Sequence, residues 1–116
     1  MINGAHVILY SADAEADRAF VRDVLGFPHV DAGNGWLIFK LPPAELAAHP
    51  TDGEPKHVFT LMCDDLDGTL GDLSAKGVTI SQPASEAGWG RLATVRLPSG
   101  ADLAIYEPHH PTAHSL

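Results

Sequence analysis

The sequence predicts an α+β fold made of two tandem units, each with the order strand, helix, strand, strand, strand. The stretches HVILYSADAEADRAFVRDVLG, at residues 6–26, and HVFTLMCDDLDGTLGDLSAKG, at 57–77, both open with His-Val and close on glycine after the same number of residues. The stretches LPPAELAAHP, at 41–50, and LPSGADLAIYEP, at 97–108, share the order Leu-Pro, small residues, an acid, leucine and alanine. Similarity of this kind within one chain indicates a duplicated structural unit.

The composition fits one folded domain, which we assign to residues 1–116. Apolar residues make up 45% of the chain, but the apolar runs are far shorter than the ~20 residues of a membrane-spanning helix. The net charge of −8 argues against nucleic acid as a partner, because phosphate recognition requires clustered cations. We see no secretory signal, and the single cysteine, Cys63, fits a reducing compartment. We therefore expect a cytoplasmic protein.

The first unit is assigned to residues 5–50. Its opening run AHVILYS, at 5–11, is rich in β-branched and aromatic residues, which predicts a strand. The Asn-Gly pair in DAGNGW, at 31–36, predicts a hairpin between two further strands. The last strand of this unit is expected within 41–50.

Both units contain a helix, which we recognise from its end signals and from apolar residues at helical spacing. The first runs from Asp13, with acidic residues in its first turn, to Gly26, which is suited to a left-handed end. The second begins at Asp64 or Asp65 and ends at Gly77. The residues that share one face are Ala16, Phe20 and Val24 in the first helix and Leu66, Leu70 and Leu73 in the second.

The second unit is assigned to residues 57–108 and opens with the strand-like run HVFTLMC. The PSG sequence at 98–100 predicts a turn before its last strand. TDGEPK at 51–56 is the expected linker between the units, and the tail at 109–116 is expected to fray. Each unit leaves one sheet face to be covered, so we expect two curved sheets around a shared groove.

These segments, in this order, resemble the vicinal oxygen chelate superfamily, which includes glyoxalase I, the bleomycin-resistance proteins and the extradiol dioxygenases. The resemblance covers residues 5–108. It rests on the paired units, the histidine that opens each of them, FVRDVLGF at the end of the first helix, and Gly-x-x-Leu in the final strand. It implies a groove between two curved mixed sheets, a small-molecule ligand or substrate, and a homodimer.

The resemblance also implies a divalent metal site, for which zinc, nickel, manganese or iron are the candidate ions. The ligands from the first strand of each unit fall on His6 and His57. The family's glutamate ligand falls on Ala104 in the second unit and on Ala47 at the equivalent position of the first. Alanine has no atom that binds a metal, so the sequence departs from the family where the metal chemistry would be done.

Three other residues are candidates to complete such a site. Glu107 lies three residues past Ala104 and is therefore expected on the opposite face of the strand. His49 and Tyr106 each lie two residues past the alanine of their unit, which places them on the alanine's face. We consider His49 and Glu107 as third metal ligands and Tyr106 as a proton donor or hydrogen-bond partner, with ordinary loop and strand-end roles left open.

Large apolar side chains on or beside the predicted sheets are candidates to line the groove, with ordinary core positions as the alternative. They are Trp36, Phe39, Phe59 and Trp89. Trp89 lies between two glycines in a connection, where a large side chain can cover the mouth of a pocket. Cys63 is expected to pack rather than react. The tail histidines are expected to form no site, because a mobile tail holds ligands poorly; they are His109, His110 and His114.

The sequence leaves three functions open. We favour binding of a small organic molecule in the groove, as in the bleomycin-resistance branch of the family, with hydrogen bonds from His6, His57 and Tyr106. The acidic net charge would favour cationic ligands. The alternative is a divalent-metal-dependent lyase, isomerase or extradiol-type dioxygenase with His6 and His57 as ligands, so whether the protein is an enzyme stays open. The third is an assembly surface without a small ligand.

Overall fold

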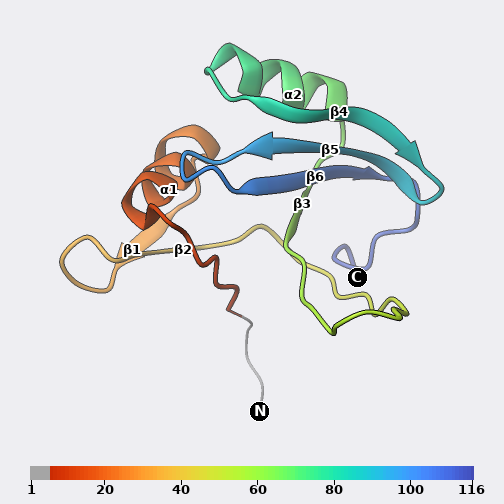
Figure 1. Cartoon of the computed structure of the whole chain (residues 1–116), viewed down its shortest axis with the longest axis horizontal. Coiled ribbons are helices and arrows are strands. Elements are labelled where there is room, and N and C mark those ends of the chain that lie inside the picture. Colours follow the sequence, from red (N-terminus) through yellow and green to blue (C-terminus); the bar gives the residue numbers. More distant parts are fainter. Residues whose placement is uncertain (1–5) are drawn as a thin grey trace.

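The computed structural model describes residues 6–116 and shows an α+β fold with two separate sheets (Figure 1). The first half contains helix α1 (Ala14–Phe20), the π-helical turn η1 (Val21–Leu25) and strands β1 (His29–Asp31) and β2 (Leu37–Phe39). The second half contains β3 (Thr60–Met62), α2 (Leu66–Ala75), β4 (Ile80–Ala87), β5 (Gly90–Arg96) and β6 (Asp102–Pro108). In the described part of the chain, no helix is long and apolar enough to cross a membrane.

The second half has the predicted order of strand, helix and three strands, and it forms a mixed sheet with strand order β3-β6-β5-β4. β3 is parallel to β6, with Thr60 opposite Ala104, and β5 is antiparallel to both of its neighbours. Side chains alternate along a strand. One face of β6 therefore carries Leu103 and Ile105, which are buried, and the other carries Ala104 and Tyr106.

The hydrophobic core lies between the buried face of this sheet and the helices. Helix α2 packs on that face, and the leucine stripe predicted for it is buried as expected. The helix begins after Asp65, whose carboxylate accepts a hydrogen bond from the Gly68 N–H at 3.1 Å. The buried apolar residues are Phe20, Leu66, Leu70, Leu73, Ala93, Val95, Leu97, Leu103 and Ile105.

The predicted helix of the first half is also confirmed. It begins after Asp13, whose side chain accepts a hydrogen bond from the Ala16 N–H at 3.1 Å. Phe20 is buried and Val24 packs partly against the core. The segment ends at Gly26, which has a left-handed φ of 73° that glycine adopts at no steric cost. The π-helical last turn was not predicted, since nothing in the local sequence signals it.

Both predicted turns are present. Strands β1 and β2 form an antiparallel pair, and the loop between them carries Asn34 at φ 54° and Gly35 at φ 83°. These left-handed residues are what an Asn-Gly hairpin requires. The turn before β6 closes with a 2.8 Å hydrogen bond from the Gly100 N–H to the Leu97 carbonyl.

Two strands predicted for the first half are missing, so the prediction of two complete five-element units was wrong there. Residues 6–11 and 41–50 form no strand, and Ala5 lies outside the described residues. A β-branched run becomes a strand only beside a partner that can take its backbone hydrogen bonds. Three prolines in 41–50 also remove donors from that segment. The sheet of the first half therefore has two strands, and the two sheets do not close around a common groove.

Candidate functional site

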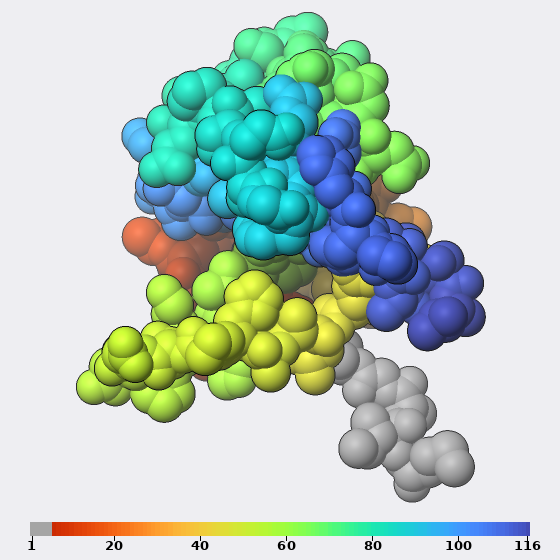
Figure 2. Space-filling model, turned by 90° about the vertical axis from the view of Figure 1, so that its right-hand side faces the viewer, coloured from red at the N-terminus to blue at the C-terminus, as the bar shows by residue number. Residues whose placement is uncertain are grey.

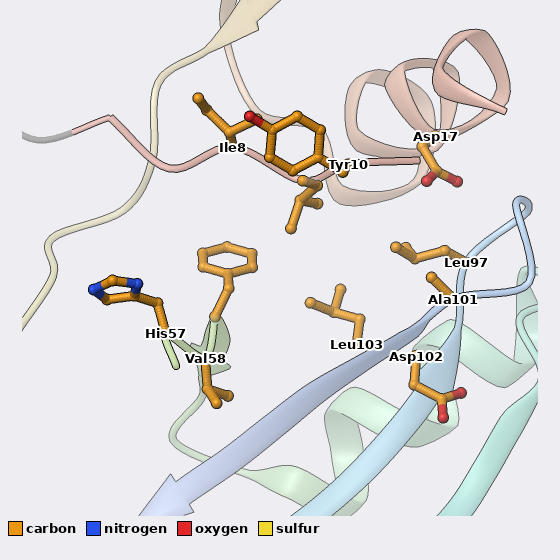
Figure 3. Close-up of a pocket in the computed structure, with 11 residues that line it drawn as sticks. Ile8, Tyr10, Asp17, His57, Val58, Leu97, Ala101, Asp102 and Leu103 are labelled. Atoms are coloured by element: carbon orange, nitrogen blue, oxygen red, sulfur yellow. The ribbon is translucent and has the colours of Figure 1, made fainter. Parts of the chain in front are cut away.

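A pocket of about 320 Å³ lies where the N-terminal segment and α1 meet the second half of the chain (Figure 3). Its apolar lining comes from Ile8 and Leu9, from Phe59 just before β3, and from Leu97 and Leu103 around the turn before β6. A volume of this size is at the lower end of the range for small-molecule sites, and such sites are mostly apolar. The pocket is therefore a candidate ligand site.

Asp17 places a buried carboxylate in the wall of this pocket, with an exposed fraction of only 6%. Its Oδ2 accepts a hydrogen bond from the Ser99 hydroxyl at 2.8 Å, and its Oδ1 accepts one from the Ser99 N–H at 3.1 Å. These contacts hold α1 against the turn before β6 and so fix two walls of the pocket. No local sequence signal points to this role, because the two residues are 82 positions apart.

Of the four aromatic residues predicted to line a groove, Phe59 lines this pocket and the other three lie elsewhere. Trp89 packs edge-on against Tyr106, with ring centroids 5.2 Å apart. Trp36 is largely exposed and lies under an arginine of α1, 4.5 Å from the guanidinium carbon to the ring centroid. Phe39 contacts a histidine of β1 edge-on at 5.6 Å.

The structure does not assemble the metal site that the resemblance implies. His6, His49 and His57 are exposed, and the ring of His57 lies at the side of the pocket, directed away from its centre (Figure 3). Among residues 6–116, no three side chains of the types His, Cys, Asp and Glu lie close enough to hold a metal ion. The donor set at these positions does not fit the implied metal, and their role as ligands stays a prediction.

Glu107 lies on the opposite face of β6 from Ala104, as strand alternation predicts. Its Oε1 accepts a hydrogen bond from the Leu66 N–H at 3.0 Å, at the first residue of α2. Its Oε2 lies 3.6 Å from Nε2 of His109. A carboxylate at the N-terminus of a helix satisfies a free N–H and interacts favourably with the helix dipole. This contact therefore gives Glu107 a structural role at α2.

Tyr106 lies on the Ala104 face of β6 and contacts two residues from distant segments. Its hydroxyl donates a hydrogen bond to Glu45 at 3.4 Å and lies 3.5 Å from Nε2 of His110. Burial and the neighbouring Glu45 raise the pKa of Tyr106. The pKa of Glu45 is held below its ordinary value, mainly by a hydrogen bond from the Ala113 N–H. Neither Glu45 nor His110 has a local sequence signal for this contact, and His110 was expected to form no site.

A family model described as the Glyoxalase/Bleomycin resistance protein/Dioxygenase superfamily matches residues 4–109. The chain belongs to this superfamily. The resemblance drawn from the paired units is thereby confirmed, and the α+β arrangement with a mixed sheet is the one found in members of the superfamily. No curated protein matches the chain significantly.

Three solved structures are similar to this chain in fold. Lactoylglutathione lyase from Agrobacterium tumefaciens is 20% identical, with a TM-score of 0.65 over 90% of this chain and 92% of that chain. TnmS3, an antibiotic binding protein from Streptomyces sp. CB03234, is 23% identical, with a TM-score of 0.63 over 93% of this chain and 99% of that chain. A superfamily member from Sphaerobacter thermophilus is 22% identical, with a TM-score of 0.61 over 90% and 97% of the two chains. At these identities the likeness shows the fold alone.

Proposed function

We propose that this superfamily member binds a small organic molecule in the pocket between the N-terminal segment, α1 and residues 57–59. One observation carries the proposal: an open, mainly apolar pocket of about 320 Å³ has a buried carboxylate, Asp17, in its wall. Small-molecule sites combine apolar walls with a few placed polar groups in this way. The carboxylate and the net charge of −8 favour a ligand that carries a positive charge or hydrogen-bond donors.

A binding role has more support than the enzymatic alternative. The alternative is a metal-dependent lyase, isomerase or dioxygenase with His6 and His57 as ligands. Lactoylglutathione lyase has the same fold, so the fold is compatible with this alternative as well. Ala47 and Ala104 speak against it, because they offer methyl groups where the resemblance implies carboxylate ligands. TnmS3, an antibiotic binding protein, has the same fold, so the fold is compatible with the binding role.

The test is direct binding of a panel of aromatic fragments of equal size that are cationic, neutral or anionic, measured by calorimetry on the metal-free chain. Ala101→Trp places a large ring at the pocket, since the Ala101 methyl points into it (Figure 3). Ala47→Trp, at an exposed position outside the pocket, is the matched control. We expect saturable binding, strongest for cationic fragments, to the native chain and to Ala47→Trp, and loss of that binding in Ala101→Trp. Undiminished binding to Ala101→Trp, or no saturable binding to the native chain, would contradict the proposal.

We also propose that two copies of the chain associate through the first half. Large apolar side chains are exposed along this half, and Tyr10, Ile38 and Leu46 have exposed fractions of 93%, 37% and 97%. Exposed large apolar side chains of this kind support an association surface. Sedimentation velocity would then give a dimer for the native chain and a monomer for Ile38→Lys, while a native monomer at high concentration would rule out the association.

A cytoplasmic location is part of the same proposal. Its support is the single cysteine, Cys63, which packs against the core and has no cysteine partner in the sequence. Burial, the largest cause, raises the pKa of this thiol and keeps it in the unreactive protonated form.

A further inference from the structure

Three segments that are far apart in the sequence bring polar side chains together beside β6. Glu45 comes from the segment at 41–50, Tyr106 from β6 and His110 from the C-terminal tail. Figure 2 shows the tail, in blue, lying against the yellow segment that precedes the linker. The Tyr106 hydroxyl is 3.4 Å from Oε1 of Glu45 and 3.5 Å from Nε2 of His110, and the last two atoms are 3.9 Å apart.

When the His110 ring is neutral, these three atoms carry lone pairs and share a single proton. Nδ1 of His110 lies 2.8 Å from the carbonyl oxygen of Pro111, which can only accept a hydrogen bond. Nδ1 must therefore carry the ring proton, and Nε2 of the neutral ring presents its lone pair to the cluster. The carboxylate of Glu45 also only accepts, so the Tyr106 hydroxyl supplies the one proton. The contact from the Tyr106 hydroxyl to Glu45, at 3.4 Å, is longer than the usual O–H···O distance of about 2.7–2.8 Å.

The spacing of the three atoms is also compatible with a bound metal ion. For a triangle with these three sides, the point equidistant from the corners lies about 2.1 Å from each atom, and zinc binds nitrogen and oxygen ligands at about 2.0–2.2 Å. We propose that Glu45, Tyr106 and His110 form a binding site for a divalent transition-metal ion of the zinc type, which would release the phenol proton of Tyr106 to solvent on binding and leave a further coordination position open to solvent.

The surroundings of the three side chains support this assignment. Metal-binding histidines usually donate their second ring N–H to a carbonyl or carboxylate, and ligating carboxylates are themselves hydrogen-bonded. His110 has such a contact to Pro111. The second oxygen of Glu45 accepts hydrogen bonds from the N–H groups of Ala113 at 2.7 Å and His114 at 3.3 Å. These contacts orient both side chains toward the common point.

The environment also suits a cation that enters from solvent. The Glu45 side chain is 13% exposed and the His110 side chain is 35% exposed, so the first is held in place while the second remains accessible. With its pKa below the ordinary value, the Glu45 carboxyl is ionised at neutral pH. The site uses none of the positions that the family resemblance assigns to metal ligands, and it lies outside the pocket of the proposed function.

Zinc titration of the tag-free, metal-free full-length chain tests the site, with calorimetry for affinity and Co²⁺ absorption in the visible range for geometry. His110→Ala removes a ligand. His114→Ala is the matched control, because it removes another tail histidine whose only contact to the cluster is its backbone N–H. Glu45→Gln and Tyr106→Phe remove the other two ligand atoms with little change of size, and far-UV circular dichroism checks the fold of each variant.

We expect about one equivalent of zinc in the native chain and in His114→Ala. Affinity should fall by at least about tenfold in His110→Ala and in Glu45→Gln, since even outer contacts of a metal site are worth tenfold or more. No saturable binding to the native chain, or an equal loss in His114→Ala and His110→Ala, would overturn the proposal, because the second result means diffuse binding by tail histidines. Fragment binding in the pocket is measured with a chelator present, so each proposal fails or stands by itself.

Discussion

Replacing Asp17 by alanine tests the contact that holds the two halves of the chain together. Asp17 is 6% exposed and accepts two hydrogen bonds from Ser99, one from the hydroxyl and one from the backbone. Both are hydrogen bonds to a charged group, and each such bond is worth about 1.5–3 kcal/mol. The substitution removes both and leaves α1 without its polar tie to the turn before β6.

Two effects reduce the loss below the sum of the two bonds. The buried carboxylate no longer has to be desolvated, and Ser99 is only half-buried, so water replaces part of what it loses. We therefore expect Asp17→Ala to lower the free energy of unfolding by about 2 kcal/mol, or the Tm by about 8 °C for a chain of this size. Ser99→Ala removes the hydroxyl but keeps the backbone donor, so it should cost about half as much.

Urea and thermal unfolding, followed by circular dichroism, measure both variants and the double variant. The two changes should be less than additive, because each removes a partner of the same contact. A free energy of unfolding for Asp17→Ala within about 0.5 kcal/mol of the native value would refute the reasoning, since that is the effect of an ordinary surface change. Fully additive effects of the two substitutions would refute it as well.

Three further outcomes follow from the same structure. Gly71→Ala should raise the free energy of unfolding by about 0.5–1 kcal/mol, because helix propensity improves and no atom lies near the added methyl. Gly90→Ala should lower the free energy of unfolding, because its methyl would collide with a backbone carbonyl of β6. Chemical unfolding of both variants measures the two effects. The pKa of Glu45 in the folded chain is below its ordinary value of 4.5. The hydrogen bond from the Ala113 N–H to the Glu45 carboxylate should therefore be fully formed above pH 4.5 and lost as the pH falls through the pKa of the folded chain. Hydrogen exchange of the Ala113 amide as a function of pH measures this loss. The pKa of Cys63 is raised, so iodoacetamide at pH 8 should alkylate it more slowly than an exposed thiol, and an equal rate would contradict this.

Much of the second half could be predicted because its signals are local. Leu66, Leu70 and Leu73 recur at helical spacing, and Asp65 is a cap of the expected type; all three leucines are buried. The position of Glu107 on the opposite face from Ala104 followed from strand alternation alone. The comparison of the two halves also led to the superfamily, which the family model confirms.

The two missing strands of the first half could not be predicted correctly from local sequence. The run at 6–11 has a strand composition, but its backbone finds no strand partner within the described chain. The same limit applies to the site residues. Asp17 and Ser99 are 82 positions apart in the sequence, and Tyr106 and Glu45 are 61 positions apart. Each contact therefore depends on tertiary packing that a short stretch of sequence does not reveal.

Amide chemical-shift mapping of the ¹⁵N-labelled chain, titrated with the tightest-binding fragment of the panel, tests the central claim most directly. Binding in the proposed pocket predicts saturable shifts that concentrate on residues 8–10, 57–59 and 97–103, and their disappearance in Ala101→Trp. Saturable shifts confined to other parts of the chain, or no saturable shifts with any fragment, would contradict the claim that this pocket is the ligand site.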